Sequence, residues 1–104
     1  MLNIVLLCAY GASTGMLCDK IIDAAKNMNI DCSVNAYSYD DADKVVPLAD
    51  IVLLGPQMRM KLRECQAKFG NQGIPFMVID IKDYGRMNGA NVLKAALAEL
   101  ENKK

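Results

Sequence analysis

The segment LNIVLLCAYGASTGMLCDKI (residues 2–21) gives the clearest indication of the fold. Residues 2–7 are almost all apolar, and so short a run before small and polar residues is typical of a strand buried on both faces of a parallel sheet. Ser13 or Thr14 can then cap a helix, which we expect to continue to about Asn29. The segment therefore predicts a strand, a turn of small residues and a helix.

The rest of the chain repeats this alternation. We expect further strands at 32–38, 50–54 and 75–79. Helical segments are expected at 40–46 (ending near Pro47), from about Met58 to Gly70, and from about Val92 onward, with a loop at 80–91 before the last. In the first helix the residues expected to face inward are Leu17, Ile21, Ala24, Ala25 and Met28.

Strands that alternate with helices predict an α/β fold. We expect residues 1–104 to form a single domain whose open four-stranded parallel sheet has the order 2-1-3-4. Helices should cover both faces, as in flavodoxin-like and low-molecular-weight-phosphatase-like folds. In such sheets ligands bind at the carboxyl ends of the strands where the winding reverses, here between the first and third strands.

The overall composition excludes several classes of protein. Twelve Lys and Arg balance twelve Asp and Glu, so the formal net charge is zero and nothing favours a nucleic-acid partner. The first apolar run has no basic residues before it, and no stretch approaches the roughly 20 apolar residues of a spanning helix. We expect a cytoplasmic protein without direct membrane insertion, whose membrane association would run through another protein.

The chain has four cysteines and no histidine. Because no two cysteines form a C-x-x-C pair, we expect neither a metal site nor a cofactor, and the thiols should be free in a reducing compartment. Cys18, Cys32 and Cys65 are interpreted as small buried apolar residues. Cys8 differs because it stands at the carboxyl end of the first strand, at the predicted winding reversal.

A turn of small residues follows Cys8, and it leads directly into the helix. Its members are Ala9, Tyr10, Gly11, Ala12, Ser13, Thr14 and Gly15. Gly11 and Gly15 permit a positive φ, and backbone N–H groups at a helix N-terminus form a site for an anion such as phosphate. The same field favours the thiolate form of a cysteine, which is the nucleophile. The alternative is an ordinary capped turn with an inert cysteine, and local sequence does not decide between the two.

The turn lacks a cation. In tyrosine-phosphatase-type sites an Arg six positions after the cysteine clamps the phosphate, and here that position is Thr14. Without the guanidinium, water should attack a phosphocysteine slowly. This favours a phosphoryl carrier over a hydrolase. A low-molecular-weight phosphatase, an arsenate-reductase-like enzyme and a non-enzymatic binding module remain the alternatives.

Three separated blocks of the chain resemble one family. They are IVLLCAYGASTGMLCDKI (4–21), ADIVLLGPQ (49–57) and VIDIKDYGRMNGANVLKAA (78–96). The chain resembles the enzyme IIB components of the bacterial phosphoenolpyruvate-dependent sugar phosphotransferase system, of the lactose/cellobiose (chitobiose) class.

The resemblance implies a role for particular residues. Cys8 would be a phosphocysteine that accepts phosphate from a phosphohistidine of enzyme IIA and passes it to a sugar held by the membrane component IIC. Residues 9–15 would form the phosphate-binding loop. The supporting loops would contain Gly55, Pro56, Gln57, Tyr84 and Gly85. Because an anion at Asp80 would repel phosphate, we expect that side chain to make a structural hydrogen bond in its loop. The sugar is not encoded here, and cellobiose, chitobiose and lactose all remain open.

Overall fold

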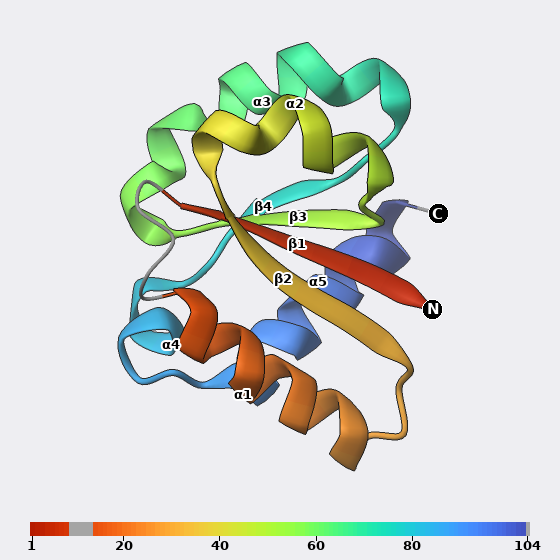
Figure 1. Cartoon of the computed structure of the whole chain (residues 1–104), viewed down its shortest axis with the longest axis vertical. Helices are drawn as coiled ribbons and strands as arrows, with labels where there is room; N and C mark the ends of the chain where they lie inside the picture. The colour runs from red at the N-terminus through yellow and green to blue at the C-terminus, as the bar shows by residue number, and fades with distance from the viewer. Residues whose placement is uncertain (9–13, 104) are drawn as a thin grey trace.

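The computed structural model describes residues 1–8 and 14–103. Four strands form one sheet, namely β1 (Leu2–Cys8), β2 (Cys32–Ser38), β3 (Ile51–Leu54) and β4 (Phe76–Val78). Their order is β2-β1-β3-β4 and every neighbouring pair is parallel, so the predicted sheet is confirmed (Figure 1).

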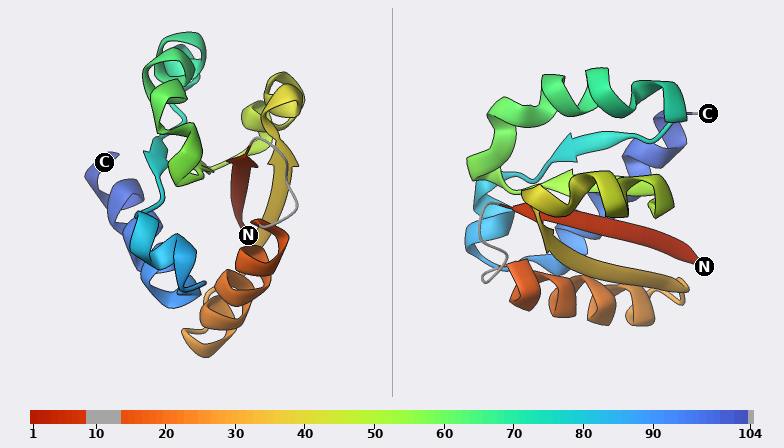
Figure 2. Two further views of the ribbon diagram at one scale, coloured as in Figure 1. Left: turned by 90° about the vertical axis from the view of Figure 1, so that its left-hand side faces the viewer. Right: turned by 45° about the horizontal axis from the view of Figure 1, so that its top comes forward.

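Helices cover both faces of this sheet, as predicted. The α-helices are α1 (Thr14–Asn27), α2 (Ala42–Val45), α3 (Leu62–Phe69), α4 (Ile81–Gly85) and α5 (Gly89–Lys103). Short 3₁₀ helices are η1 (Tyr39–Asp41), η2 (Val46–Leu48), η3 (Pro56–Lys61) and η4 (Gly70–Gln72). Helices α1 and α5 lie on one face, and α2 and α3 lie on the other (Figures 1 and 2). Among the described residues, we find no helix with the length and apolarity needed to cross a membrane.

The central strand β1 supplies both cores of the protein. Ile4 and Leu6 pack with α1 and α5, whereas Val5 and Leu7 pack with α2 and α3. Successive side chains of a strand point to opposite faces, so a strand covered on both sides must be apolar at nearly every position. This explains the continuous apolar run.

Helices α1 and α5 cross in close contact at Gly89. A Cβ at this position would lie 2.6 Å from the backbone nitrogen of Ile21 and closer still to the carbonyl group of Lys20. These are backbone atoms, which cannot rotate away as a side chain can. The crossing therefore requires glycine at position 89, and it fixes α1 against the last helix.

The helix expected from Met58 to Gly70 consists of two parts. Residues 56–61 form the 3₁₀ helix η3, and only from Leu62 does the chain become α-helical. Met58 is buried, whereas Met60 is 75% exposed. Similarly, Pro47 does not end the segment that begins near residue 40, because it lies in the first turn of η2, where its missing N–H costs no bond.

Two other expectations are wrong at helix ends. Helix α1 ends at Asn27, and Met28 is 40% exposed rather than inward-facing. Asn29 adopts a left-handed conformation with φ 57°, and Ile30 N donates to Ala25 O at 2.8 Å, which closes the helix. The predicted loop at 80–91 contains helix α4, and α5 already begins at Gly89.

Candidate functional site

Cys8 is the last residue of β1, and its side chain is only 1% exposed. In register it lies beside Ser38 of β2, and the strand alternation places it on the same face as Ile4 and Leu6. Helix α1 covers this face and begins at Thr14. The structure thus places Cys8 at the predicted winding reversal, shortly before a helix N-terminus.

The residues predicted to bind phosphate are only partly described. Ala9, Tyr10, Gly11, Ala12 and Ser13 lie outside the described residues. Thr14 starts α1, and Gly15 has a helical backbone in its first turn, so a positive φ at Gly15 is not used. Among the described residues, no atom lies within 4 Å of the place a Gly15 Cβ would take.

The loop after β3 is attached to β1 directly beside Cys8. Gly55 N donates a hydrogen bond to Leu7 O at 3.1 Å. A Cβ on Gly55 would lie 2.8 Å from Gln57 Oε1, which shows that the Gln57 side chain folds back over the glycine. Pro56 starts η3 between them. The predicted Gly55-Pro56-Gln57 loop is therefore brought to the site.

The segment after β4 is helical and is positioned by Asp80. The Asp80 carboxylate accepts a hydrogen bond from Lys82 N at 2.8 Å, and so caps α4. This confirms the structural role expected for Asp80. Ile79 N donates to Leu54 O at 2.9 Å, which holds the start of the segment against β3. Tyr84 is half-buried in α4 and Gly85 ends that helix, exposed.

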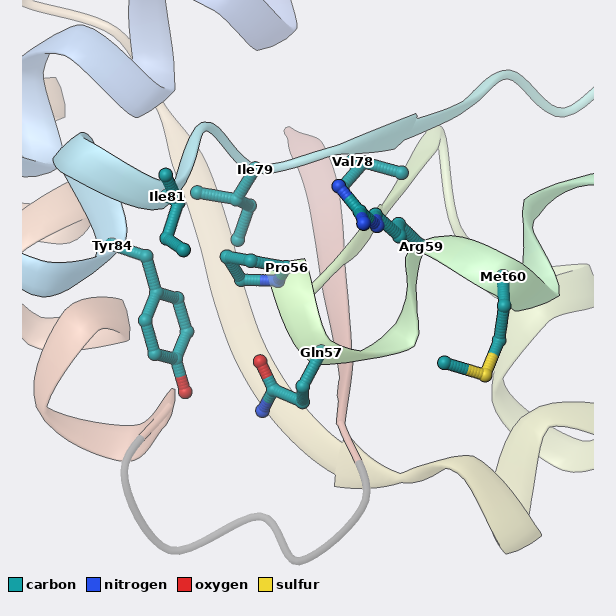
Figure 3. A pocket seen from close by; sticks show the side chains of 8 residues that line it. All are labelled: Pro56, Gln57, Arg59, Met60, Val78, Ile79, Ile81 and Tyr84. Carbon is teal, nitrogen blue, oxygen red and sulfur yellow. The ribbon is translucent and has the colours of Figure 1, made fainter.

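A pocket of about 620 Å³ lies between η3 and α4 at the carboxyl ends of β3 and β4. Its lining residues are Pro56, Gln57, Arg59, Met60, Val78, Ile79, Ile81 and Tyr84 (Figure 3). The polar ends of Gln57 and Tyr84 face the same side of the pocket, the side on which α1 begins. The pocket thus joins two of the predicted supporting loops beside the end of β1.

Sequence reasoning missed Ile81 as a site residue. Its side chain is 73% exposed although it is large and apolar, and it lines the pocket together with Met60. Ile81 is the first residue of α4, directly after the capping residue Asp80. A capping residue followed by a large apolar residue, here Asp80 and Ile81, was the one sequence signal for this helix start.

The other three cysteines are buried or half-buried. Burial raises the pKa of Cys18 to about 11, with further contributions from Asp19 and Cys8. Burial also raises the pKa of Cys65, whose Sγ lies 3.6 Å from Tyr39 Oη. Cys32 is only half-buried, so the expectation of full burial is wrong for it, but burial still raises its pKa. Raised pKa values keep these thiols protonated and unreactive.

The fold and the site together define a class: small open-sheet α/β proteins with a nucleophile-type residue at the winding reversal. A model of the family described as "PTS system, Lactose/Cellobiose specific IIB subunit" matches residues 3–95. The chain therefore belongs to the lactose/cellobiose-specific IIB subunits of the sugar phosphotransferase system, whose members take part in sugar phosphotransfer during transport.

Individual relatives agree with this family. The cellobiose-specific EIIB component of Lactococcus lactis subsp. lactis (strain IL1403) is 39% identical over 98 residues, covering 89% of this chain and 91% of that protein. The galactose-specific EIIB component of Lactococcus lactis subsp. cremoris (strain MG1363) has the same identity and coverage. The solution structure of a cellobiose-specific IIB component from Borrelia burgdorferi has a TM-score of 0.80 and 38% identity, covering 99% of this chain and 94% of that one.

Proposed function

We propose that Cys8 carries the phosphoryl group of this IIB subunit. Its sulfur would attack the phosphorus of a phosphohistidine on enzyme IIA, forming an S–P bond while the P–N bond breaks and the imidazole leaves. A hydroxyl of a sugar held by the membrane component IIC would then attack the same phosphorus. That second step breaks the S–P bond and frees the Cys8 thiolate for another cycle.

The observation that carries the proposal is the position of Cys8. It ends the central strand at the winding reversal, and the N-terminus of α1 follows within a few residues. Backbone N–H groups at such a helix start compensate phosphate charge. Of the other cysteines, Cys18 lies inside α1, Cys32 begins β2 and Cys65 lies in α3, so none of them ends a strand.

Two features of the sequence support a carrier rather than a phosphatase. The chain has no histidine, so the phosphohistidine has to come from a partner. Residues 9–15 contain no Lys or Arg, so the charge that develops when water attacks a phosphocysteine is poorly compensated. The proposal includes residues 9–15 as phosphate ligands, Gln57 and Tyr84 as neighbours of the site, and a cytoplasmic location beside IIC.

The sugar stays open between cellobiose, chitobiose, lactose and similar β-glycosides. Relatives named for cellobiose and for galactose share the same identity with this chain, so overall similarity does not choose between them.

The test is phosphorylation in a reconstituted system. The chain is incubated with phosphoenolpyruvate, enzyme I, HPr and IIA, and the adduct is located by mass spectrometry under conditions that preserve phosphocysteine. We expect phosphate on Cys8 in the wild type and in the matched control Cys32→Ser, and none in Cys8→Ser. Phosphate on another residue, or none at all, would refute the carrier function. Rapid, Cys8-dependent hydrolysis of p-nitrophenyl phosphate would favour the phosphatase instead.

A further inference from the structure

Strand β4 leaves one edge of the sheet unpaired within the described residues, because it pairs only with β3. Pro75 O accepts a hydrogen bond from Val52 N at 3.0 Å, and Ile79 N donates to Leu54 O at 2.9 Å. In a parallel ladder the residues that bond to one neighbour alternate along the strand. The N–H and C=O groups of Phe76 and Val78 therefore point outward from the sheet.

A groove follows this outer edge. It consists of two adjoining cavities of about 450 and 280 Å³, which share the lining residues Gln66, Phe76 and Glu99. Helices α3 and α5 cover opposite faces of the sheet, so they form the two walls on either side of β4 (Figure 2). The groove has the shape needed for an extended polypeptide that adds a strand to the sheet.

The groove carries negative charge. Asp80, Asp83 and Glu99 line its larger cavity, and none of the described residues lining either cavity is Lys or Arg. Asp80 Oδ1 accepts from Lys82 N and Asp83 Oδ1 accepts from Asn91 Nδ2 at 3.2 Å, which holds two of these carboxylates in place. A carboxylate has about four acceptor positions, so both can still bind a cation.

We propose that the β4 edge is a docking site for an extended segment of a partner protein that carries Lys or Arg side chains. The outward main-chain groups of Phe76 and Val78 bind the backbone of the segment. The three carboxylates select its charge. This site is separate from Cys8, but it ends at Asp80, the residue that caps α4. A segment bound along β4 would therefore hold its protein next to the pocket that contains Tyr84.

Charge decides against a second copy of this chain as the occupant. If two β4 edges paired, the carboxylates around one edge would face those around the other, and like charges in contact oppose association. An extended segment with positive side chains meets no such opposition.

The alternation of side chains along β4 predicts the sequence pattern of the partner segment. Phe76 and Val78 pack with the α3-side core, whereas Met77 packs with the α5-side core, the side on which Glu99 lies. A strand added to β4 alternates in the same way. Its apolar residues should face α3 and its cationic residues should face α5.

The probe is the acetylated and amidated hexapeptide Val-Lys-Val-Lys-Val-Lys, added to the full chain and followed by NMR. We expect saturable shifts along β4 and the facing residues of α3 and α5, and at least about tenfold slower hydrogen exchange of the Phe76 and Val78 amides at saturation. The same peptide with Glu in place of Lys, and one with N-methylated valines, should each bind at least about tenfold more weakly.

Two variants localise the effect. Glu99→Lys should weaken binding about three- to tenfold, because it replaces an attractive charge in the groove by a repulsive one. Glu101→Lys is the matched control on the same helix, outside the groove lining, and should leave the affinity within about twofold. Equal binding of the Lys and Glu peptides, shifts confined to another surface, or equal effects of both variants would overturn the proposal.

Self-association is a separate outcome. The Phe76 and Val78 amides could be protected from hydrogen exchange even without peptide. If dilution of the protein then removes this protection, the edge binds a second copy and the proposal is wrong. None of these measurements needs phosphoryl transfer, so this proposal and the function proposed for Cys8 can fail independently.

Discussion

Replacing Gly89 by alanine should loosen the contact between α1 and α5. The added Cβ would lie 2.6 Å from Ile21 N and closer to the carbonyl group of Lys20, well inside van der Waals contact. Forcing an atom into a packed contact costs about 1–3 kcal/mol, and here the neighbours are backbone atoms of a helix that must move as a unit. A cost near the upper end of this range is expected.

The intrinsic helix propensity of alanine opposes this loss by up to about 1 kcal/mol. The net loss of unfolding free energy should therefore be about 2 kcal/mol, which for a domain of this size lowers Tm by roughly 8–16 °C. Chemical denaturation and calorimetry measure both values. NMR shifts should spread along both helices from the α1–α5 contact.

Gly70→Ala is the matched control. Gly70 has an ordinary φ of −60°, and no atom of the described residues lies within 4 Å of the place its Cβ would take. This variant should leave stability unchanged or raise it by up to about 1 kcal/mol. If Gly89→Ala were as stable as Gly70→Ala, the close crossing of α1 and α5 would be refuted.

Three more predictions concern capping, titration and a buried thiol. Asp80→Ala removes the cap of α4, so it should lower the free energy of unfolding by about 1 kcal/mol and speed hydrogen exchange of the Lys82 amide. Asp80→Asn should keep most of the stability and of the amide protection, because asparagine also caps helices. Equal exchange in the wild type and both variants would contradict the cap. The Cys18 thiol has a pKa near 9 when unfolded and about 11 when folded, so the unfolded chain loses this proton first and stability should fall as pH rises from 9 to 11. Cys18→Ala should make the decrease in the urea midpoint shallower, and an unchanged slope would rule out this titration. Tyr39→Phe removes the hydroxyl that accepts from Cys65 Sγ at 3.6 Å and should cost up to about 1 kcal/mol in denaturation; a larger loss would mean that the ring itself has shifted.

The sequence was sufficient for the sheet because its signals are strong and local. The apolar runs 2–7 and 50–54 belong to β1 and β3, which are buried on both faces and contain few polar residues. The small residues after Cys8 likewise revealed where the chain leaves the sheet. These features need no knowledge of which elements touch each other.

The wrong predictions concern a very short helix and a change from 3₁₀ to α-helix. Helix α4 has only five residues, too few for a periodic pattern, and its one signal is the cap at Asp80. Met60 was expected in an α-helix, but it lies in the 3₁₀ helix η3. A 3₁₀ helix has about three residues per turn rather than 3.6, so its side chains point in other directions.

Parts of the site depend on contacts between distant segments. The bond between Gly55 N and Leu7 O follows from the pairing of β1 with β3, and the pocket follows from the approach of η3 to α4. No local pattern encodes either arrangement. Ile81 and Met60 are far apart in the sequence, and only the folded chain brings them into one pocket.

The near-complete burial of Cys8 has a kinetic consequence for the proposed relay. Cys8 pairs with Ser38 of β2 and is only 1% exposed, which leaves little room for two partners at the sulfur together. Donor and acceptor would then have to meet the sulfur in turn. Transfer should then show ping-pong kinetics, with parallel double-reciprocal lines as the donor concentration is varied at several fixed acceptor concentrations.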